Sequence, residues 1–565
     1  MKRTLFFLLF ISAIAAFAAS RTATVTGTVT GTVTGYDGKP LPVAQIHILN
    51  FEKQNSNYTK DHNQDLEIYT VNPDGSFRFR TKEKGLVVIQ MTGVGYYAYE
   101  TPLFIDKANI IVQAQLQPYN YFSSFDTVKI VGDFNKFDFK SAQTMTKNAD
   151  GTFSAEFGVQ ADTFAYQLLG VEKTGRSING TQADFYVYDG GGDYRSVVRA
   201  QGGRVKITFD PQKLPMASPA AQAEWQPADV SDFVRAYADM KAREMDFQKA
   251  IQGKWSSTDT VVAEAKKRID VLTGLIGKEK NKRLRELLFD EYFIYGGIGI
   301  YKHASIADSV LVWRALKEIS PVSPLWSIEI SDIASAVTLA GNKAGLPYFD
   351  KFLAGYPSAD MKAQALFDEC DMLKFTKQND ELDKYYRILA KNYSHNPVMM
   401  IAKQQFSPDA RIAAGKHIPA FRVRSVDDST VIYNDKDLQG KYYLIDFWAT
   451  WCHPCLDELP NVEKAYEKFK GNNFEILSIS FDQNPDHVVR FRQKKMKMPW
   501  LNGFADSSFT GSLAKAFEVV GIPKPILVDP SGNIVAVNTD LRGPNLDATL
   551  TKFLLGDKAA FEQTK

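Results

Sequence analysis

Two cysteines, Cys452 and Cys455, stand two residues apart in the segment Trp451-Cys452-His453-Pro454-Cys455. The apolar run at residues 442–448 before them reads as a buried strand, and the residues after them repeat apolar side chains at helical spacing. The pair therefore lies where a strand passes into a helix. The first turn of a helix offers free N–H groups and a partial positive charge, which stabilise a thiolate, the form of cysteine that attacks disulfides. The segment predicts a redox-active dithiol.

A close cysteine pair can also serve a zinc site or a structural disulfide. Zinc takes four ligands, usually as two pairs of similar spacing, but the third cysteine of the chain, Cys370, is far away in the sequence. A disulfide across so short a loop constrains little of the unfolded chain. Redox chemistry is therefore favoured. Cys370 itself lies in a helical pattern, where a buried, inert thiol is favoured over a further resolving cysteine.

Residues 1–20 have the build of a secretory signal. Lys2 and Arg3 precede an apolar core, and Ala16-Phe17-Ala18 fits the small-x-small cleavage rule. This predicts export, with the bacterial periplasm as the expected compartment. An uncleaved signal that holds the protein at the membrane is the alternative, although the apolar stretch is shorter than the span of about twenty residues that crosses a bilayer.

The chain of 565 residues is long enough for about three to five domains. Its formal net charge of +2 and the lack of a basic tract predict no nucleic-acid partner. Residues 21–120 and 121–216 carry strand patterns separated by turn signals. Residues 227–405 carry helical periodicity, and Gly296-Gly297-Ile298-Gly299 within them predicts a break between two helices.

Both β-rich segments resemble known sandwich families. Residues 21–120 hold the turn Asp37-Gly38-Lys39-Pro40-Leu41 and the strand start Asp74-Gly75-Ser76-Phe77, and they resemble the carboxypeptidase-regulatory-like β-sandwich. The run at residues 128–135, which ends Gly132-Asp133-Phe134-Asn135, resembles the early-set sandwich of glycogen-binding modules. Those modules hold sugars on tryptophans, and the first tryptophan here is Trp225, so glycan binding is not expected.

Residues 413–557 resemble the extracytoplasmic TlpA/ResA-like branch of the thioredoxin family. The matching motifs are Phe447-Trp448-Ala449-Thr450-Trp451-Cys452-His453-Pro454-Cys455, Glu458-Leu459-Pro460, Gly521-Ile522-Pro523 and Asp529-Pro530-Ser531-Gly532. The resemblance implies a thioredoxin fold and a thiol-disulfide oxidoreductase that needs no cofactor and no metal beyond its own cysteine pair. The expected fold class is multidomain: two β-sandwiches, an α-helical, helical-repeat-like middle and a C-terminal α/β thioredoxin fold.

The resemblance also implies roles for the residues of the dithiol centre. Cys452 is the attacking thiol, and the more buried Cys455 is the resolving thiol. Asp446 matches the buried acid that manages the proton of the resolving thiol in thioredoxins. Glu458 matches the acid of the family's C-x-x-E motif, although the helix dipole alone would also favour a first-turn acid there.

A second set of residues is expected to meet the substrate. Ile522 precedes a proline, Pro523, that is expected in the cis form, and its backbone would pair with an extended peptide. Pro525 removes one strand donor nearby, which makes the local geometry less certain. Pro454 fits the first turn of a helix, where its missing N–H needs no partner.

The side chains around the dithiol leave alternatives open. Trp451 and Trp448 would shape an apolar rim, with a core position as the alternative for Trp448. His453 either favours the Cys452 thiolate as a cation or only faces solvent.

Reduction of disulfides in partner proteins, fed by an upstream electron donor, is the favoured function. Peroxidase activity is disfavoured because Ala449 stands where a peroxiredoxin has threonine or serine. A disulfide oxidase or isomerase stays open, since the sequence does not set the redox potential. So does a non-enzymatic, partner-binding protein with a vestigial thioredoxin domain.

Overall fold

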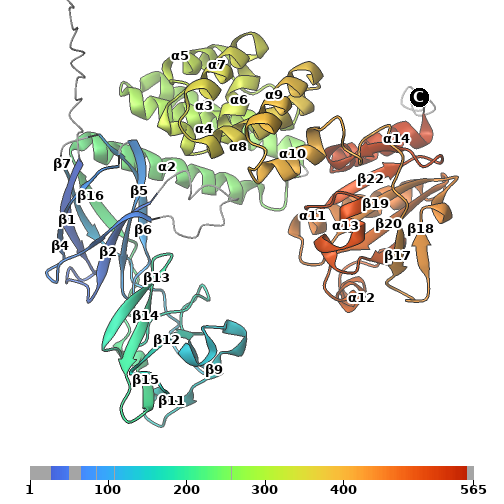
Figure 1. The fold of residues 1–565 in the computed structure, drawn as a ribbon. Coiled ribbons are helices and arrows are strands. Elements are labelled where there is room, and N and C mark those ends of the chain that lie inside the picture. Colours follow the sequence, from blue (N-terminus) through green and yellow to red (C-terminus); the bar gives the residue numbers. More distant parts are fainter. Residues whose placement is uncertain (1–26, 50–64, 84, 107–108, 256, 557–565) are drawn as a thin grey trace, which may run out of the picture. The chain divides into compact units, whose positions relative to one another are not determined.

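The computed structural model describes residues 27–49, 65–83, 85–106, 109–255 and 257–556 (Figure 1). The signal expected at residues 1–20 lies outside them. The chain divides into two compact units, Met1–Asp239 and Met240–Lys565. Within the described residues, no helix combines the length and the apolar character that crossing a membrane requires.

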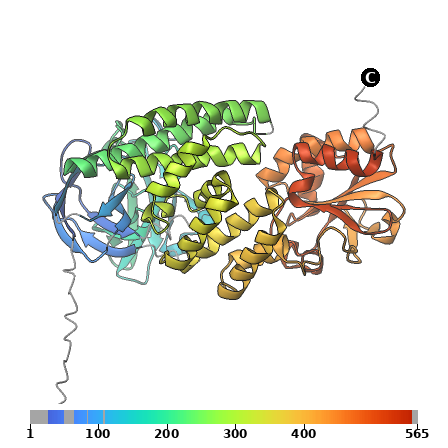
Figure 2. The ribbon, with the colours of Figure 1, turned by 90° about the horizontal axis from the view of Figure 1, so that it is seen from above.

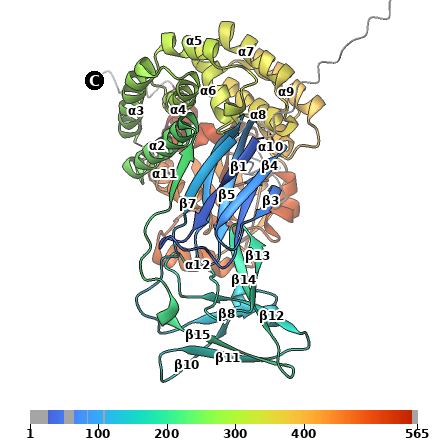
Figure 3. The same ribbon diagram turned by 90° about the vertical axis from the view of Figure 1, so that its left-hand side faces the viewer.

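The first β domain consists of two four-stranded sheets that share one apolar core (Figure 3). One sheet has the order β16-β7-β1-β4 and the other β3-β2-β5-β6. The strands are β1 (Gly27–Thr34), β2 (Ala44–Leu49), β3 (Asp65–Thr70), β4 (Ser76–Thr81), β5 (Gly85–Gly93), β6 (Tyr99–Ile105), β7 (Asn109–Gln115) and β16 (Gln222–Gln226). The strand β16 comes from outside the predicted range of this domain, pairs antiparallel with β7 and brings Trp225 into the core.

The second β domain also has two sheets around one core, with the orders β10-β11-β15 and β13-β14-β12-β8-β9. The strands are β8 (Lys129–Gly132), β9 (Gln143–Thr144), β10 (Thr146–Lys147), β11 (Phe153–Gly158), β12 (Thr163–Leu169), β13 (Phe185–Gly190), β14 (Asp193–Arg199) and β15 (Arg204–Phe209). Phenylalanine and tyrosine side chains make up much of this core.

The helical middle packs around a continuous apolar core of its own (Figure 2). Its helices are α2 (Ala228–Ile251), α3 (Thr258–Lys278), α4 (Lys282–Tyr301), α5 (Ser309–Glu318), α6 (Ser331–Ala340), α7 (Asn342–Gly355), α8 (Ala359–Phe375), α9 (Asn379–Asn392) and α10 (Val398–Phe406). The boundary between the two compact units falls inside α2.

The helix break predicted at Gly296-Gly297-Ile298-Gly299 is wrong, because α4 runs through these residues without interruption. The glycines instead permit close packing. A Cβ atom on Gly297 would lie 2.4 Å from Ser335 Oγ of α6, and one on Gly299 would lie 2.8 Å from the backbone oxygen of Ala304. A glycine-rich sequence favours a helix break, but it does not show which neighbouring residue occupies the space that a side chain would fill.

The C-terminal domain is a seven-stranded sheet of order β18-β17-β21-β20-β19-β22-β23 with helices packed on it. The strands are β17 (Arg422–Ser425), β18 (Ile432–Asn434), β19 (Tyr442–Trp448), β20 (Phe474–Ser480), β21 (Leu501–Phe504), β22 (Lys524–Val528) and β23 (Ile534–Val537), and the helices are α11 (His453–Phe469), α12 (Pro485–Lys494), α13 (Ser512–Ala516) and α14 (Pro544–Leu555). Strand-rich N-terminal domains, a helical middle and an α/β C-terminal domain confirm the multidomain arrangement that the sequence predicts.

The strand β19 positions the dithiol. It runs parallel to β20 and antiparallel to β22, and its side chains are buried apart from the half-buried first residue. The register sets Asp446 opposite Pro525 and Phe447 opposite Lys524, so Pro523 lies beside the end of β19. Pro525 is the second residue of β22, and the pairing of β22 with β23 starts only at the next residue, Ile526. The missing N–H of Pro525 is therefore accommodated.

The packing role of Gly299 gives a direct test. Gly299→Ala should lower the free energy of unfolding by about 1–3 kcal/mol, because the new methyl group meets a backbone oxygen. The matched control is Gly274→Ala in α3, where the space around the new Cβ is open. That change should raise stability by roughly 0.5–1 kcal/mol through helix propensity alone. Urea unfolding followed by circular dichroism measures both, and an equal response of the two variants would contradict the packing role.

Candidate functional site

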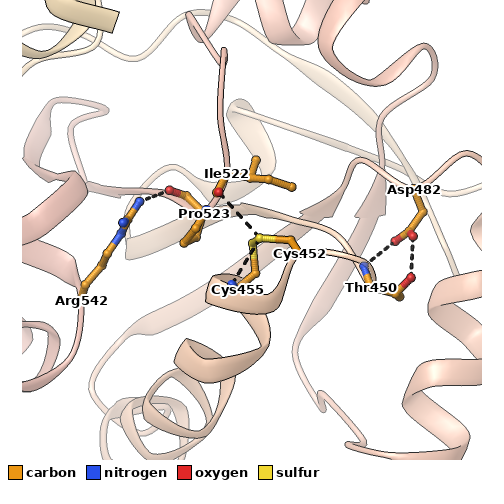
Figure 4. Close-up of a disulfide and its surroundings, with 7 residues drawn as sticks. All are labelled: Thr450, Cys452, Cys455, Asp482, Ile522, Pro523 and Arg542. Atoms are coloured by element: carbon orange, nitrogen blue, oxygen red, sulfur yellow. Dashed lines mark hydrogen bonds between the residues drawn. A yellow bond between two sulfur atoms is a disulfide. The ribbon is translucent and has the colours of Figure 1, made fainter. Parts of the chain in front are cut away.

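The two cysteines form a disulfide at the start of α11 (Figure 4). Cys452 is the N-cap residue of that helix, and its Sγ accepts the backbone N–H of Cys455 at 3.3 Å. The side chains are 5% and 2% exposed, so Cys452 is only slightly more open than Cys455. When the pair is reduced, this N–H and the positive end of the helix favour a negative charge on Cys452.

The loop around Ile522-Pro523 lies across from the disulfide. The Ile522–Pro523 peptide bond is cis, as the resemblance led us to expect. The carbonyl oxygen of Ile522 lies 3.6 Å from Cys452 Sγ (Figure 4). Ile522 is half-buried and Pro523 is buried. The structure thus brings together cysteines and a loop that are seventy residues apart in the chain.

Two acids come from the two elements that meet at the dithiol, β19 and α11. Asp446 is buried in β19, and burial raises its pKa to about 7, while Arg542 acts to lower it and Glu458 acts to raise it. Glu458 follows Cys455 by one turn of α11. Its Oε1 accepts the Gly543 N–H at 2.8 Å and the Asn461 Nδ2–H at 3.1 Å. Burial raises the pKa of Glu458 despite these contacts.

Arg542 is a member of the site that the sequence did not reveal. It lies between the short 3-10 helix η7 (Asn538–Leu541) and α14. Its Nη2–H donates to the carbonyl oxygen of Pro523 (Figure 4). Burial lowers the pKa of the guanidinium, and Asp446 and Glu458 act to raise it. No local pattern marks Arg542, because the groups that it meets come from distant parts of the chain.

Asp482 is a second residue that the sequence analysis missed. Its buried carboxylate accepts the Thr450 N–H at 3.0 Å and the Thr450 hydroxyl at 2.6 Å (Figure 4). The Ser480 hydroxyl also donates to it, at 2.8 Å. These bonds fix the turn that joins β19 to α11, two residues before Cys452. The available signal was an acid two residues after the apolar run that forms β20, although the sequence analysis did not use that run.

Of the two tryptophans that were expected to form an apolar rim around the dithiol, only one is exposed. Trp451 is 52% exposed and faces Phe509, with 6.3 Å between the ring centroids. His453 and Pro454 are exposed beside it. Trp448 is fully buried, with its ring against Phe491, so the core alternative describes it.

The third cysteine takes no part in this centre. Cys370 is a free thiol on α8, fully buried in the core of the helical middle, and burial raises its pKa. The prediction that it is buried is confirmed.

The environment of Asp446 predicts a pH-dependent stability. The folded protein holds a proton on Asp446 up to a pKa of about 7, whereas the unfolded chain releases it near about 4, so stability is lost as pH rises between these values. Asp446→Asn removes this loss and should gain roughly 4 kcal/mol on the wild type between about pH 4 and about pH 8. Thermal unfolding across this range measures it. A pH-independent effect of Asp446→Asn would contradict the assignment.

Comparison with known proteins points to the same domain. The thioredoxin-like family model matches residues 440–534. The thiol-disulfide oxidoreductase ResA of Bacillus cereus is 27% identical over 150 residues, which cover 26% of this chain and 81% of ResA. The thiol:disulfide interchange protein HelX of Rhodobacter capsulatus is 32% identical over 154 residues, which cover 27% of this chain and 81% of HelX.

A solved structure is also similar to part of this chain. The crystal structure of the thioredoxin domain of a thiol-disulfide oxidoreductase from Bacteroides vulgatus is 32% identical, with a TM-score of 0.23. The match covers 25% of this chain and 98% of that domain.

Proposed function

This chain belongs, through its C-terminal domain, to the thioredoxin-like family of thiol-disulfide oxidoreductases, and on that premise we propose that it is exported and reduces disulfides in partner proteins. The observation that carries the direction of attack is the position of Cys452. Its Sγ is the N-cap of α11 and accepts the Cys455 N–H, so the negative charge belongs on this sulfur.

The proposed reaction moves two electrons to the partner. The Cys452 thiolate attacks one sulfur of the partner disulfide, forms a mixed disulfide, and releases the other sulfur as a thiolate that takes up a proton. Cys455 then gives its proton to the carboxylate pair of Glu458 and Asp446. Its thiolate attacks Cys452 Sγ and releases the second partner thiolate. The Cys452–Cys455 disulfide is left behind, and an upstream donor must return two electrons to it.

The surroundings of the disulfide suit an extended peptide. The backbone of Ile522 lies beside Cys452 Sγ, where it can pair with a peptide strand. The exposed side chains of Trp451, His453 and Pro454 border the same place. We assign these residues to substrate binding. The cysteine pair carries the electrons, and we propose no separate cofactor or metal.

Export and the roles of the other domains are part of the proposal. Export is supported by the signal-like sequence at residues 1–20. It is also supported by the cysteine content, because the 3 cysteines form one close pair and leave one buried thiol. We propose the periplasm as the compartment. The β domains and the helical middle would position the thioredoxin domain or recognise partners.

The reaction predicts distinct outcomes for the two cysteines. Cys452→Ser should abolish reduction of insulin disulfides, because no attacking thiolate is left. Cys455→Ser should keep the attack but trap mixed disulfides, which thiol-blocked, non-reducing gels resolve as larger species. Cys370→Ser is the matched control and should leave the rate unchanged, because this thiol is buried in another domain. Insulin reduction by Cys452→Ser would refute the proposal.

Disulfide oxidation is a second candidate function, and one observation favours it. The helix end and the Cys455 N–H stabilise the Cys452 thiolate, and a stabilised reduced form makes a dithiol a stronger oxidant. The two acids beneath oppose this by disfavouring negative charge on Cys455. We therefore expect a reduction potential near about −270 mV, measured by equilibration with glutathione or dithiothreitol. A value near about −120 mV would make the protein an oxidase instead.

A further inference from the structure

We infer that Arg542 is a positioning residue of the redox centre, which fixes the loop of the cis proline and, through its charge, lowers the pH at which Asp446 and Glu458 lose their protons. This inference rests on the proposed function and deepens it. It assigns a role to a residue from the C-terminal end of the domain, outside the sequence motifs of the dithiol.

The geometry connects two sides of the site through two consecutive residues. The Arg542 guanidinium donates from Nη2 to the carbonyl oxygen of Pro523 (Figure 4). The next N–H, that of Gly543, donates to Glu458 Oε1 at 2.8 Å. Gly543 adopts a φ of 53° and a ψ of −135°, a conformation that favours glycine. The two consecutive residues Arg542 and Gly543 therefore hold both the cis-proline loop and the carboxylate of Glu458.

The charges around Arg542 are unbalanced. One guanidinium interacts electrostatically with two carboxyl groups, those of Asp446 and Glu458, and all three side chains are buried or half-buried. Two ionised acids would leave a net negative charge beside the dithiol, so each acid raises the other's affinity for a proton. Arg542 opposes this on both acids.

Three other cationic or ionisable basic residues of this domain either have a partner of their own or are exposed. Lys524 follows the cis proline directly, but its Nζ donates to the backbone oxygen of Glu518 at 2.8 Å. Lys468 of α11 pairs with Asp547 of α14 at 2.7 Å. His453 is exposed on the first turn of α11. Among the residues that the structure describes, Arg542 is thus the cation that acts on Asp446 and Glu458 together.

The consequence concerns the proton of Cys455. Resolution of the mixed disulfide needs an ionised carboxylate to accept that proton, so its rate should rise with pH through the range in which the acid pair ionises. Loss of the Arg542 charge raises the pH at which the pair ionises, because an opposite charge favours the charged form. The acidic limb of the rate profile then moves to higher pH.

The test compares charge-removing and charge-keeping variants in the full-length protein. Single-turnover reduction of a disulfide peptide is followed by stopped flow between about pH 5 and about pH 9. Arg542→Gln should move the midpoint of the acidic limb up by about one pH unit, a loss of roughly tenfold in rate below the midpoint, with the wild-type rate regained at high pH. Arg542→Lys keeps the charge and should keep the midpoint. Arg490→Gln, an exposed site on α12, is the matched control and should change nothing.

A second variant moves the profile the other way. Glu458→Gln removes the like charge beside Asp446 and should lower the midpoint, and Glu458→Gln with Arg542→Gln should lie between the two single variants. Glu458→Gln tests, even where Arg542→Gln folds poorly, whether charge around the acid pair sets the midpoint, and an unchanged midpoint in Glu458→Gln would overturn the electrostatic role. Alkylation of the reduced cysteines by iodoacetamide needs no partner protein, and it should show the same ordering of midpoints.

The outcomes separate this inference from the proposed function. The electrostatic role would be overturned if the wild type is active and Arg542→Gln is slower by the same factor at every pH. It would also be overturned if the midpoint of Arg542→Lys matches that of Arg542→Gln. A wild type that reduces no disulfide at any pH would refute the proposed function alone. The alkylation profile would still support or overturn the role of Arg542.

Discussion

The redox centre depends on one junction, the turn from β19 into α11. Because Cys452 is the N-cap, its sulfur replaces the usual capping oxygen and accepts the Cys455 N–H. The same turn is fixed from outside by Asp482, which binds both the N–H and the hydroxyl of Thr450. The reactivity of the thiol is therefore a property of how a helix begins and of what holds that beginning in place.

The proton chemistry depends on a different constraint, which is burial of charge. Asp446 lies within the sheet, and Glu458 is anchored by the Gly543 N–H. Asp446 is buried and Glu458 is half-buried, and the ionisation of each acid depends on the other groups, since Arg542 acts to lower the pKa of both. The same guanidinium holds the Pro523 carbonyl, which ties the acid pair to the loop across from the disulfide. In the proposed reaction, substrate contact and proton transfer would in this way be linked through one side chain.

The remaining domains follow simpler rules. Alternating apolar residues and turn signals predicted the β-rich segments, and helical periodicity predicted the middle. Two features could not be read in this way. The strand β16 joins the first sheet from a position after the second β domain, and α4 continues through a glycine-rich segment. In both cases a partner that is distant in sequence, β7 or α6, decides the outcome.

The sequence by itself determined the dithiol at Cys452 and Cys455, its place at a strand-to-helix junction, the acid one helical turn on and the cis proline at Pro523. Each of these is a local pattern with a local physical cause or a family motif. The tertiary structure alone decided that Trp448 is core while Trp451 is exposed, and that Asp482 and Arg542 belong to the site. These residues act through burial and through partners brought close by strand pairing, and neither property is written in the neighbouring sequence.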